Sequence, residues 1–276
     1  MDLPRRKELF QREIIHFFKE KLEQEVDILS SSNSGVITLQ VKNIPIVVVL
    51  QSYGSITETM DWNKLRKEFS TQSMIWIGQD QWEYQNEIVT SRLRSLMGHT
   101  KRIHGRQTKI RKLNKTDALQ FLEQHHLQVP IPGKYKYGLF LGEELVAVMV
   151  LSRKRMIDRA GVAHASYELM RFCNKRGTTV VGGMSKLLKH FIREVQPDDI
   201  MSYVDRDWSD GKTYVKQGFE FQEEVPPMFF WVHPEEGKRW YPQFLPEELQ
   251  ERNETLEQKG YVRMWNSGSL KYLFLR

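Results

Sequence analysis

The stretch Tyr167–Phe221 constrains the fold more than any other part of the chain. It predicts an extended segment, a glycine turn at Val180–Met184 and then an amphipathic helix. One apolar stripe runs along that helix, made of Met184, Leu187, Leu188, Phe191, Ile192 and Val195. Pro197 ends the helix, and a buried strand at Ile200–Val204 precedes a short helix that carries Tyr214. The stretch therefore predicts one continuous α/β unit.

The turn before this helix contains two adjacent glycines, Gly182 and Gly183. The first N–H groups of a helix have no acceptor within it, and a glycine brings no Cβ that would keep an anion away. The pair therefore predicts a phosphate site. A tight turn from strand to helix that binds no ligand explains the two glycines equally well.

The order of elements in this stretch resembles the core of the GNAT acyltransferase family. Val181–Ser185 looks like the loop that receives the pyrophosphate of acyl-CoA, and the segment 211–220 looks like the second signature, a tyrosine helix followed by Gly-Phe. The loop departs from the family pattern at Thr179 and Met184. The further elements expected are strands at 110–113, 137–141, 145–152 and 165–173, a helix at 115–126, and Met228–Val232 closing the sheet.

The resemblance implies acetyl-CoA or a related acyl-CoA as cofactor. The residues matched to cofactor binding are Val181, Gly182, Gly183, Met184, Ser185 and Lys186. Tyr214 would be the acid that protonates the leaving thiolate, and Asp205 would assist the attacking amine. The candidates for the acceptor site are His126, Arg171, Arg206 and Trp208.

Each of these roles has a structural alternative. Tyr214 can be a half-buried aromatic residue, and Asp205 can cap the next helix together with Asp207 or pair with Arg206. His126 can be a helix-terminal histidine favoured by the helix dipole. The segment 202–205 is also similar to the phage Mom DNA-modification proteins, which makes a base in DNA a candidate acceptor.

The N-terminal part reads as helix (5–25), a Ser-rich turn, two strands (36–41 and 44–50), helix (62–69), strand (74–77) and helix (81–97). This order and the segment 74–93 resemble the degenerate Vsr-like PD-(D/E)xK nuclease domains of homing-endonuclease-like proteins from phages and mobile elements, which carry a similar GNAT-like domain behind the nuclease. Thr38 and Val49 stand near the positions where metal-binding acids are expected, and only Glu13 remains. No metal site is therefore predicted.

A basic segment free of acids follows, from Ser91 to Leu113. Its candidate nucleic-acid-binding residues are Arg92, Arg94, Lys101, Arg102, Arg106, Lys109 and Arg111. Such a run can neutralise several phosphates and produce salt-dependent binding. A solvated helix end and linker would show the same composition.

The chain as a whole has 276 residues, a net charge of +6 and one cysteine, Cys173. This predicts a cytoplasmic protein without a membrane partner, and it leaves the oligomeric state open. The expected fold class is α/β (α+β). The expected parts are a nuclease-like domain (1–98), a basic bridge (99–113), a GNAT-like domain with a mixed sheet and flanking helices (107–234), and a C-terminal helix (246–259) and hairpin (261–275) in an extension (235–276).

The first functional hypothesis is an acyl-CoA-dependent transferase of GNAT type that acts on nucleic acid, DNA foremost, as in DNA base modification. The alternative is a non-catalytic DNA-binding protein derived from a homing endonuclease. A minor alternative is an active metal-dependent nuclease with relocated acids, Glu13, Asp27 and Glu58.

Overall fold

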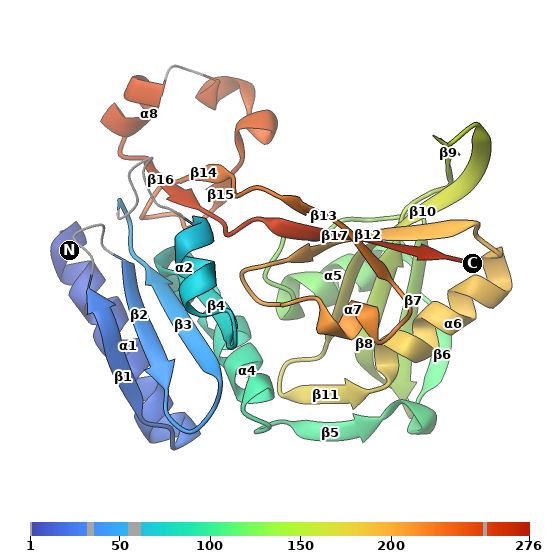
Figure 1. Cartoon of the computed structure of the whole chain (residues 1–276), viewed down its shortest axis with the longest axis horizontal. Helices are drawn as coiled ribbons and strands as arrows, with labels where there is room; N and C mark the ends of the chain where they lie inside the picture. The colour runs from blue at the N-terminus through green and yellow to red at the C-terminus, as the bar shows by residue number, and fades with distance from the viewer. Residues whose placement is uncertain (1, 32–35, 55–61, 251–252) are drawn as a thin grey trace. The chain divides into compact units, whose positions relative to one another are not determined.

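The computed structural model describes residues 2–31, 36–54, 62–250 and 253–276, which form a mixed α/β chain (Figure 1). The chain folds into two compact units. Unit 1 comprises Met1–Asn86, Val204–Gly211 and Glu224–Ser269, and unit 2 comprises Glu87–Tyr203, Lys212–Glu223 and Leu270–Arg276. The segment 235–269, expected as an extension behind the second domain, thus belongs to the unit that contains the N-terminal elements.

Unit 1 contains a four-stranded sheet in the order β1-β2-β3-β4. The strands are β1 (Val26–Ser31), β2 (Val36–Val41), β3 (Ile46–Gln51) and β4 (Ser73–Gly78). Pairing is antiparallel up to β3 and parallel between β3 and β4, which α2 (Trp62–Glu68) connects. Residues 47–51 of β3 are all buried, as expected for a central strand with apolar side chains on both faces. The strand β1 was not expected, because only a turn was predicted after the first helix.

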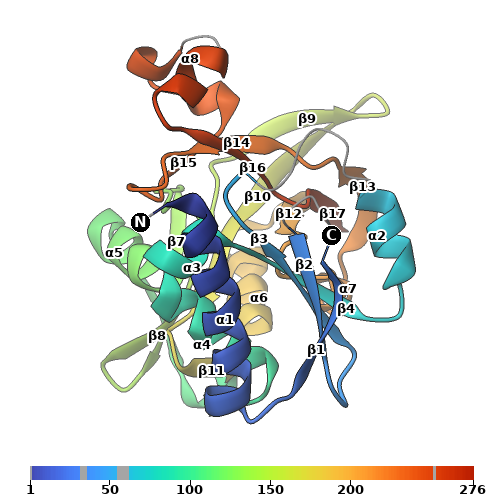
Figure 2. The same cartoon turned by 90° about the vertical axis from the view of Figure 1, so that its left-hand side faces the viewer.

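The helix α1 (Leu3–Leu22) runs alongside this sheet (Figure 2). Asp2 caps it by accepting the N–H of Arg5, and Pro4 stands in its first turn. Its buried residues Phe10, Ile14, Phe17, Phe18 and Leu22 form the apolar face of the helix.

Unit 1 also contains a small sheet in the order β15-β14-β16. Its strands are β14 (Phe229–Val232), β15 (Arg239–Trp240) and β16 (Val262–Trp265); the segment between β15 and β16 holds the 3-10 turns η2 (Pro242–Phe244) and η3 (Glu247–Leu249) and the helix α8 (Asn253–Gln258). The prediction that residues 228–232 close the large sheet was therefore wrong, because β14 pairs on both sides within this smaller one. The single helix predicted at 246–259 was also wrong, since η3 and α8 are separate.

Unit 2 is built on most of an eight-stranded sheet with the path β13-β17-β12-β10-β8-β7-β6, to which β9 is added on β10. The bounds are β6 (Lys109–Lys112), β7 (Tyr135–Leu141), β8 (Glu144–Leu151), β9 (Arg155–Arg159), β10 (Val162–Asn174), β12 (Asp199–Asp205), β13 (Glu220–Val225) and β17 (Ser269–Leu275). The expected hairpin at 261–275 was wrong, because β16 and β17 lie in different sheets. Asn266 in the turn between them accepts the N–H of Met228, so the turn is bonded to another segment.

Helices and one short strand pair complete unit 2. They are α4 (Asn86–Leu96), α5 (Lys115–His125), α6 (Gly183–Val195), α7 (Lys212–Val215), η1 (Gly105–Gln107) and the parallel strands β5 (Lys101–His104) and β11 (Thr178–Val181). The helix predicted over 81–97 is broken at Gln85 into α3 (Gln79–Tyr84) and α4. Among the helices described, none has an apolar stretch long enough to cross a membrane.

The stripe predicted on α6 is confirmed. Met184, Leu187, Leu188 and Phe191 are buried. The ring of Phe191 lies 5.3 Å from the rings of both Tyr135 and Tyr167, so α6 packs on the sheet through edge-to-face aromatic contacts. This packing fixes the position of the helix N-terminus.

The first prediction concerns a buried ion pair in unit 1. The carboxylate of Asp80 is 2% exposed and lies 2.9 Å from Nη2 of Arg239. Arg239→Ala would leave this carboxylate buried without its partner, and we expect a loss of about 3–5 kcal/mol in the free energy of unfolding, measured in urea. Arg111→Ala, which removes an exposed pair with Glu143, is the control and should leave the midpoint unchanged. Equal midpoints for both variants would contradict the assignment.

Candidate functional site

The glycine loop lies between β11 and α6. Gly182 is in the left-handed region (φ 74°), and a Cβ added to it would meet nothing within 4 Å. A Cβ on Gly183 would come within 3.0–3.1 Å of the side chains of Val180 and Leu139. Gly183 is therefore required by close packing, whereas Gly182 leaves the entrance of the helix open.

The first turn of α6 presents backbone donors. Lys186 is the first residue of the helix whose N–H donates to a carbonyl one turn earlier, that of Gly182, at 3.0 Å. The N–H groups of Gly183, Met184 and Ser185 precede it and have no acceptor inside the helix. The first turn contains no acidic side chain. The loop thus has the donors that an anion requires.

The side chain of Lys186 hydrogen-bonds to the protein backbone. Its Nζ donates to the carbonyl of Gly105 at 2.9 Å and to that of Thr108. These bonds tie η1 to the start of α6. Strand β5 lies beside the same loop, with His104 opposite Val181 in the parallel pairing with β11. The sequence did not indicate β5, because only Ile103 in its four residues is apolar and buried.

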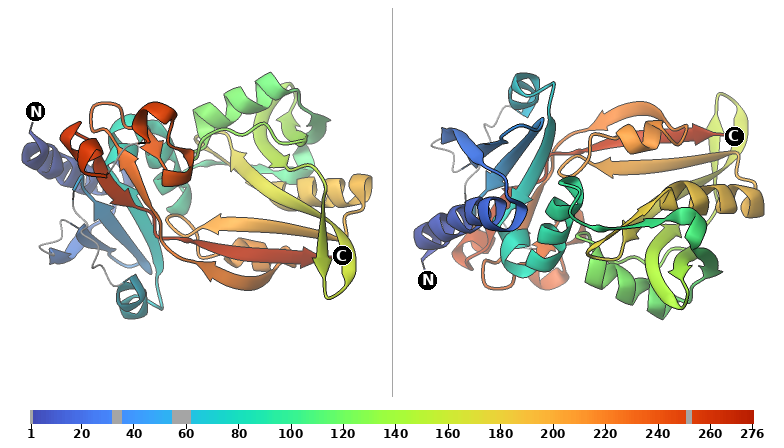
Figure 3. Two further views of the ribbon diagram at one scale, coloured as in Figure 1. Left: turned by 90° about the horizontal axis from the view of Figure 1, so that it is seen from above. Right: turned by 90° about the horizontal axis from the view of Figure 1, so that it is seen from below.

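Tyr214 lies where two parallel strands separate. β10 and β12 pair only from Ser166↔Asp199 to Glu168↔Met201, and Figure 3 shows β10 moving away from β12 beyond that end. The hydroxyl oxygen of Tyr214 is 3.5 Å from Oγ of Ser202 on β12. Burial raises the pKa of Tyr214, while Ser202 and the charge of Arg171 act in the opposite direction. The phenol is therefore protonated at neutral pH and can donate a proton.

His126 and Arg171 are brought close together in unit 2. His126 caps the C-terminus of α5 and accepts the N–H of Gln128 on Nδ1 at 3.0 Å. Burial, and then the positive charges of Arg92 and Arg171, lower the pKa of His126 to about 3. The imidazole is therefore neutral, and the helix dipole does not hold it as a cation. Burial also raises the pKa of Cys173 to about 12, so this thiol is not a nucleophile.

The remaining candidates, Asp205, Arg206 and Trp208, lie in unit 1. Oδ1 of Asp205 accepts the N–H of Asp207 at 2.9 Å, a local turn bond, whereas the sequence had suggested a cap on the next helix or a pair with Arg206. Arg206 pairs with Glu224 at 2.7 Å, and Trp208 is buried. Because Tyr214 belongs to unit 2, the two proposed catalytic residues stand in different units.

Asp207 is the titratable residue whose environment the sequence did not reveal. It is 3% exposed, and its Oδ1 accepts the N–H of Ser267 at 2.7 Å. Burial, and then the negative charge of Asp205, raise its pKa to about 7. The partner is 60 residues away, so no local pattern could have found it.

The basic segment is part of the folded sheet structure. Arg92 and Arg94 lie on α4, and Arg111 on β6 forms an ion pair with Glu143 at 2.7 Å. The exposed basic strip consists of Lys101 and Arg102 on β5, Arg106 in η1 and Lys109 on β6. These four side chains are carried by backbone in and next to strands that are hydrogen-bonded to β11 and β7. We call them the basic strip below.

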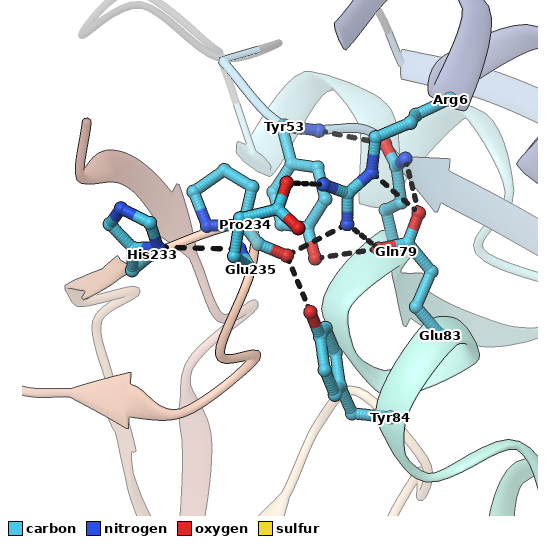
Figure 4. Close-up of polar contacts among 8 residues, drawn as sticks. All are labelled: Arg6, Tyr53, Gln79, Glu83, Tyr84, His233, Pro234 and Glu235. Carbon is cyan, nitrogen blue, oxygen red and sulfur yellow. Dashed lines mark hydrogen bonds and ion pairs between the residues drawn. The ribbon is translucent and has the colours of Figure 1, made fainter. Parts of the chain in front are cut away.

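Unit 1 has a polar cluster organised by one arginine (Figure 4). Arg6 lies 2.5 Å from Glu83 and 2.6 Å from Glu235, and it also donates to the carbonyl of Pro234 at 2.7 Å. The hydroxyl of Tyr53 donates a hydrogen bond to Glu83 at 3.0 Å, and the side-chain amide of Gln79 donates one to the same carboxylate at 2.9 Å. The cluster therefore has a guanidinium at its centre.

The acids considered for a nuclease site are dispersed. Glu13 accepts the indole N–H of Trp82, Asp27 lies 3.4 Å from Lys42, and Glu58 is outside the described residues. Thr38 and Val49 are buried and stand opposite each other in the sheet. Across the parts of the chain that the structure describes, no group of three or more His, Cys, Asp or Glu residues is placed to hold a metal ion.

Comparison with solved structures finds acetyltransferases. A Bacillus subtilis acetyltransferase in complex with CoA is 14% identical, with a TM-score of 0.36, over 61% of this chain and 99% of that one. A GNAT family acetyltransferase from Elizabethkingia anophelis with acetyl-CoA bound is 12% identical, with a TM-score of 0.35, over 62% and 99%. One from Desulfovibrio desulfuricans is 9% identical, with a TM-score of 0.38, over 61% and 98%. No family model and no curated protein matches the chain.

The second prediction concerns Asp207. Because its pKa is higher in the folded protein than in the unfolded chain, the folded state binds the extra proton, and stability falls as pH rises from about 4 to 7. Asp207→Asn keeps the acceptor for Ser267 and cannot ionise. We expect the variant to gain about 1–3 kcal/mol in unfolding free energy at pH 8 and nothing at pH 4, measured by urea titration at both. The control is Asp158→Asn at an exposed position of β9; a gain by Asp207→Asn at pH 4 would contradict the argument.

Proposed function

We propose that the chain is an N-acyltransferase of GNAT type that uses acetyl-CoA or a related acyl-CoA. The observation that carries this proposal is the position of Tyr214, a protonated phenol at the separation of β10 and β12. The same strand β10 leads through β11 to the open N-terminus of α6. A proton donor and a set of backbone anion donors therefore belong to one sheet and its adjoining helix.

The residues divide the work as follows. The N–H groups of Gly183, Met184 and Ser185 bind the pyrophosphate, and the open Gly182 lets it approach. Val181 ends the strand, and Lys186 holds the loop in place through Gly105 and Thr108. Acyl-CoA, when bound, supplies an activated thioester. Tyr214 donates its proton to the leaving sulfur, and Asp205 is proposed to hold the incoming amine.

For the acceptor we propose nucleic acid, with DNA foremost and an exocyclic base amine as the attacking group. Support comes from the basic strip, from the net charge of +6 and from a pI near 9.2. His126, Arg171, Arg206 and Trp208 are the proposed acceptor-site residues. A cytoplasmic location, a nuclease origin of unit 1 and a phage or mobile-element context remain predictions from the sequence.

A second candidate function is nucleic-acid binding without catalysis. Two observations favour it. The loop has Thr179 and Met184 where the resemblance leads one to expect other residues, and the amine of Lys186 is bonded to carbonyl groups. Binding of acyl-CoA separates the two functions, because only the transferase requires it.

The third prediction tests the cofactor loop by calorimetric titration with acetyl-CoA. Ser185→Glu places a negative charge in the first turn of α6. This charge interacts favourably with the helix dipole, so the helix should remain stable, but it repels a phosphate. We expect saturable binding by the wild type and an affinity lower by about tenfold or more in Ser185→Glu. Lys189→Gln, which changes the net charge by the same one unit at an exposed position one turn further along, is the matched control. Absence of binding by the wild type would favour the non-catalytic function.

The fourth prediction tests the basic strip. Lys101→Ser with Arg102→Ser removes two phosphate contacts, so the slope of log affinity against log salt should fall by about 2 for a short DNA duplex. The affinity itself should fall at low salt, as measured by fluorescence anisotropy. Lys19→Ser with Lys21→Ser removes the same charge from exposed positions on α1. If both double variants lose the same slope, the strip has no special role.

A further inference from the structure

Where β10 separates from β12, a side chain donates a hydrogen bond to a backbone carbonyl of β10. Pairing ends at Glu168↔Met201, and the next residues are Leu169 and Ser202. Oγ of Ser202 lies 2.9 Å from the carbonyl oxygen of Leu169. Ser202 is 1% exposed, so this contact is buried. A serine hydroxyl thus stands at the first position where the parallel ladder fails.

The same hydroxyl reaches Tyr214. Oγ of Ser202 is 3.5 Å from the phenol oxygen, so its single proton can be donated to either oxygen atom. The ring of Tyr214 is held by neighbours on two sides, stacked on Tyr272 at 5.8 Å and edge-on to Phe219 at 5.4 Å. The phenol oxygen therefore has a fixed position, and Ser202 is the side chain bonded to it.

The strand β10 also carries a cation, Arg171. The guanidinium of Arg171 donates to the carbonyls of Met170 at 2.7 Å and Val129 at 3.1 Å, which fixes its position on β10. Its charge acts on Tyr214 and favours the ionised phenol. Tyr214 and Arg171 are both half-buried, and a cation has a stronger effect on such an equilibrium there than it has in bulk water.

We infer that Ser202 positions the hydroxyl of Tyr214 as proton donor and hydrogen-bonds the phenolate left after donation. The inference rests on the proposed acyltransferase activity. In the step, the amine nitrogen bonds to the acyl carbon and the C–S bond of the thioester breaks. The O–H bond of Tyr214 breaks at the same time, and its proton forms an S–H bond on the leaving sulfur. The proton of Ser202 then turns from Leu169 to the phenolate oxygen. The proton released by the attacking amine later restores the phenol through water.

The experiment titrates Tyr214 directly and requires no acceptor. Protein labelled with 3-fluorotyrosine, whose phenol ionises at lower pH than tyrosine, is followed by fluorine NMR, and the Tyr214 signal is assigned by its loss in Tyr214→Phe. In Ser202→Ala the titration midpoint should rise by about half a pH unit or more, because the phenolate loses a hydrogen bond. Arg171→Met should raise it as well. Ser202→Thr keeps the hydroxyl and should return the midpoint to that of the wild type.

Two controls complete the test. Thr178→Val removes another side-chain hydroxyl of unit 2, one that donates to the carbonyl of Lys175 at 2.7 Å, and should leave the midpoint unchanged. Calorimetry with acetyl-CoA on the same variants should give affinities within about twofold of the wild type. A Ser202→Ala midpoint equal to that of the wild type overturns the inference, whether or not acetyl-CoA binds. A raised midpoint together with no acetyl-CoA binding by the wild type supports the hydrogen bond but overturns the acyltransferase role.

Discussion

The separation of β10 from β12 is the constraint on which the rest of unit 2 depends. Parallel strands that stay paired bury their backbone groups against each other and leave no room for a ligand. Here the ladder stops after Glu168↔Met201, and β10 continues antiparallel to β8 alone. The same strand then leads into β11 and the glycine loop, while β12 carries Ser202 toward Tyr214. Both halves of the proposed site follow from this one change of partner.

Unit 1 is organised by two arginines, Arg6 and Arg239, and the carboxylates they bind. A guanidinium offers five donors in a fixed plane, so it can satisfy several carboxylates and carbonyls at once without a metal ion. Arg6 does this for Glu83, Glu235 and Pro234, and Arg239 does it for Asp80. Such pairs are costly to desolvate but fix the relative positions of the segments that carry them. The N-terminal helix and the segment 233–239 are bonded in this way within unit 1.

The basic strip belongs to ordered backbone in and next to strands and not to a mobile linker, and this changes the entropic cost of binding a phosphate. In a mobile linker, the backbone around each lysine or arginine would lose conformational freedom when the side chain bound a phosphate. Lys101, Arg102 and Lys109 instead stand on strands paired with β11 and β7. Their backbone is already ordered, so a smaller entropic cost opposes binding. The bonds from Lys186 to Gly105 and Thr108 connect this strip to the start of α6.

The sequence by itself determined the elements whose signal is local. Periodicity within a few residues identified α1, the strands β2 and β3 and the buried stripe of α6, and it placed Gly182 at the start of that helix and Tyr214 on a short one. The strands β7 and β8 were expected from the resemblance to the GNAT family. These features depend on contacts between near neighbours in the chain, which the pattern of apolar residues records.

Only the tertiary structure decided which segments share a sheet and which polar groups meet. It put β17 between β12 and β13, moved β14 into another sheet, bonded Asp207 to Ser267 and Lys186 to Gly105, and brought Ser202 to Tyr214. A short apolar strand such as β14 has the same alternation of side chains whichever sheet accepts it. A carboxylate or a lysine shows no sequence signal for a partner that is distant along the chain, because that encounter is set by the path of the chain and by the burial of the groups along it.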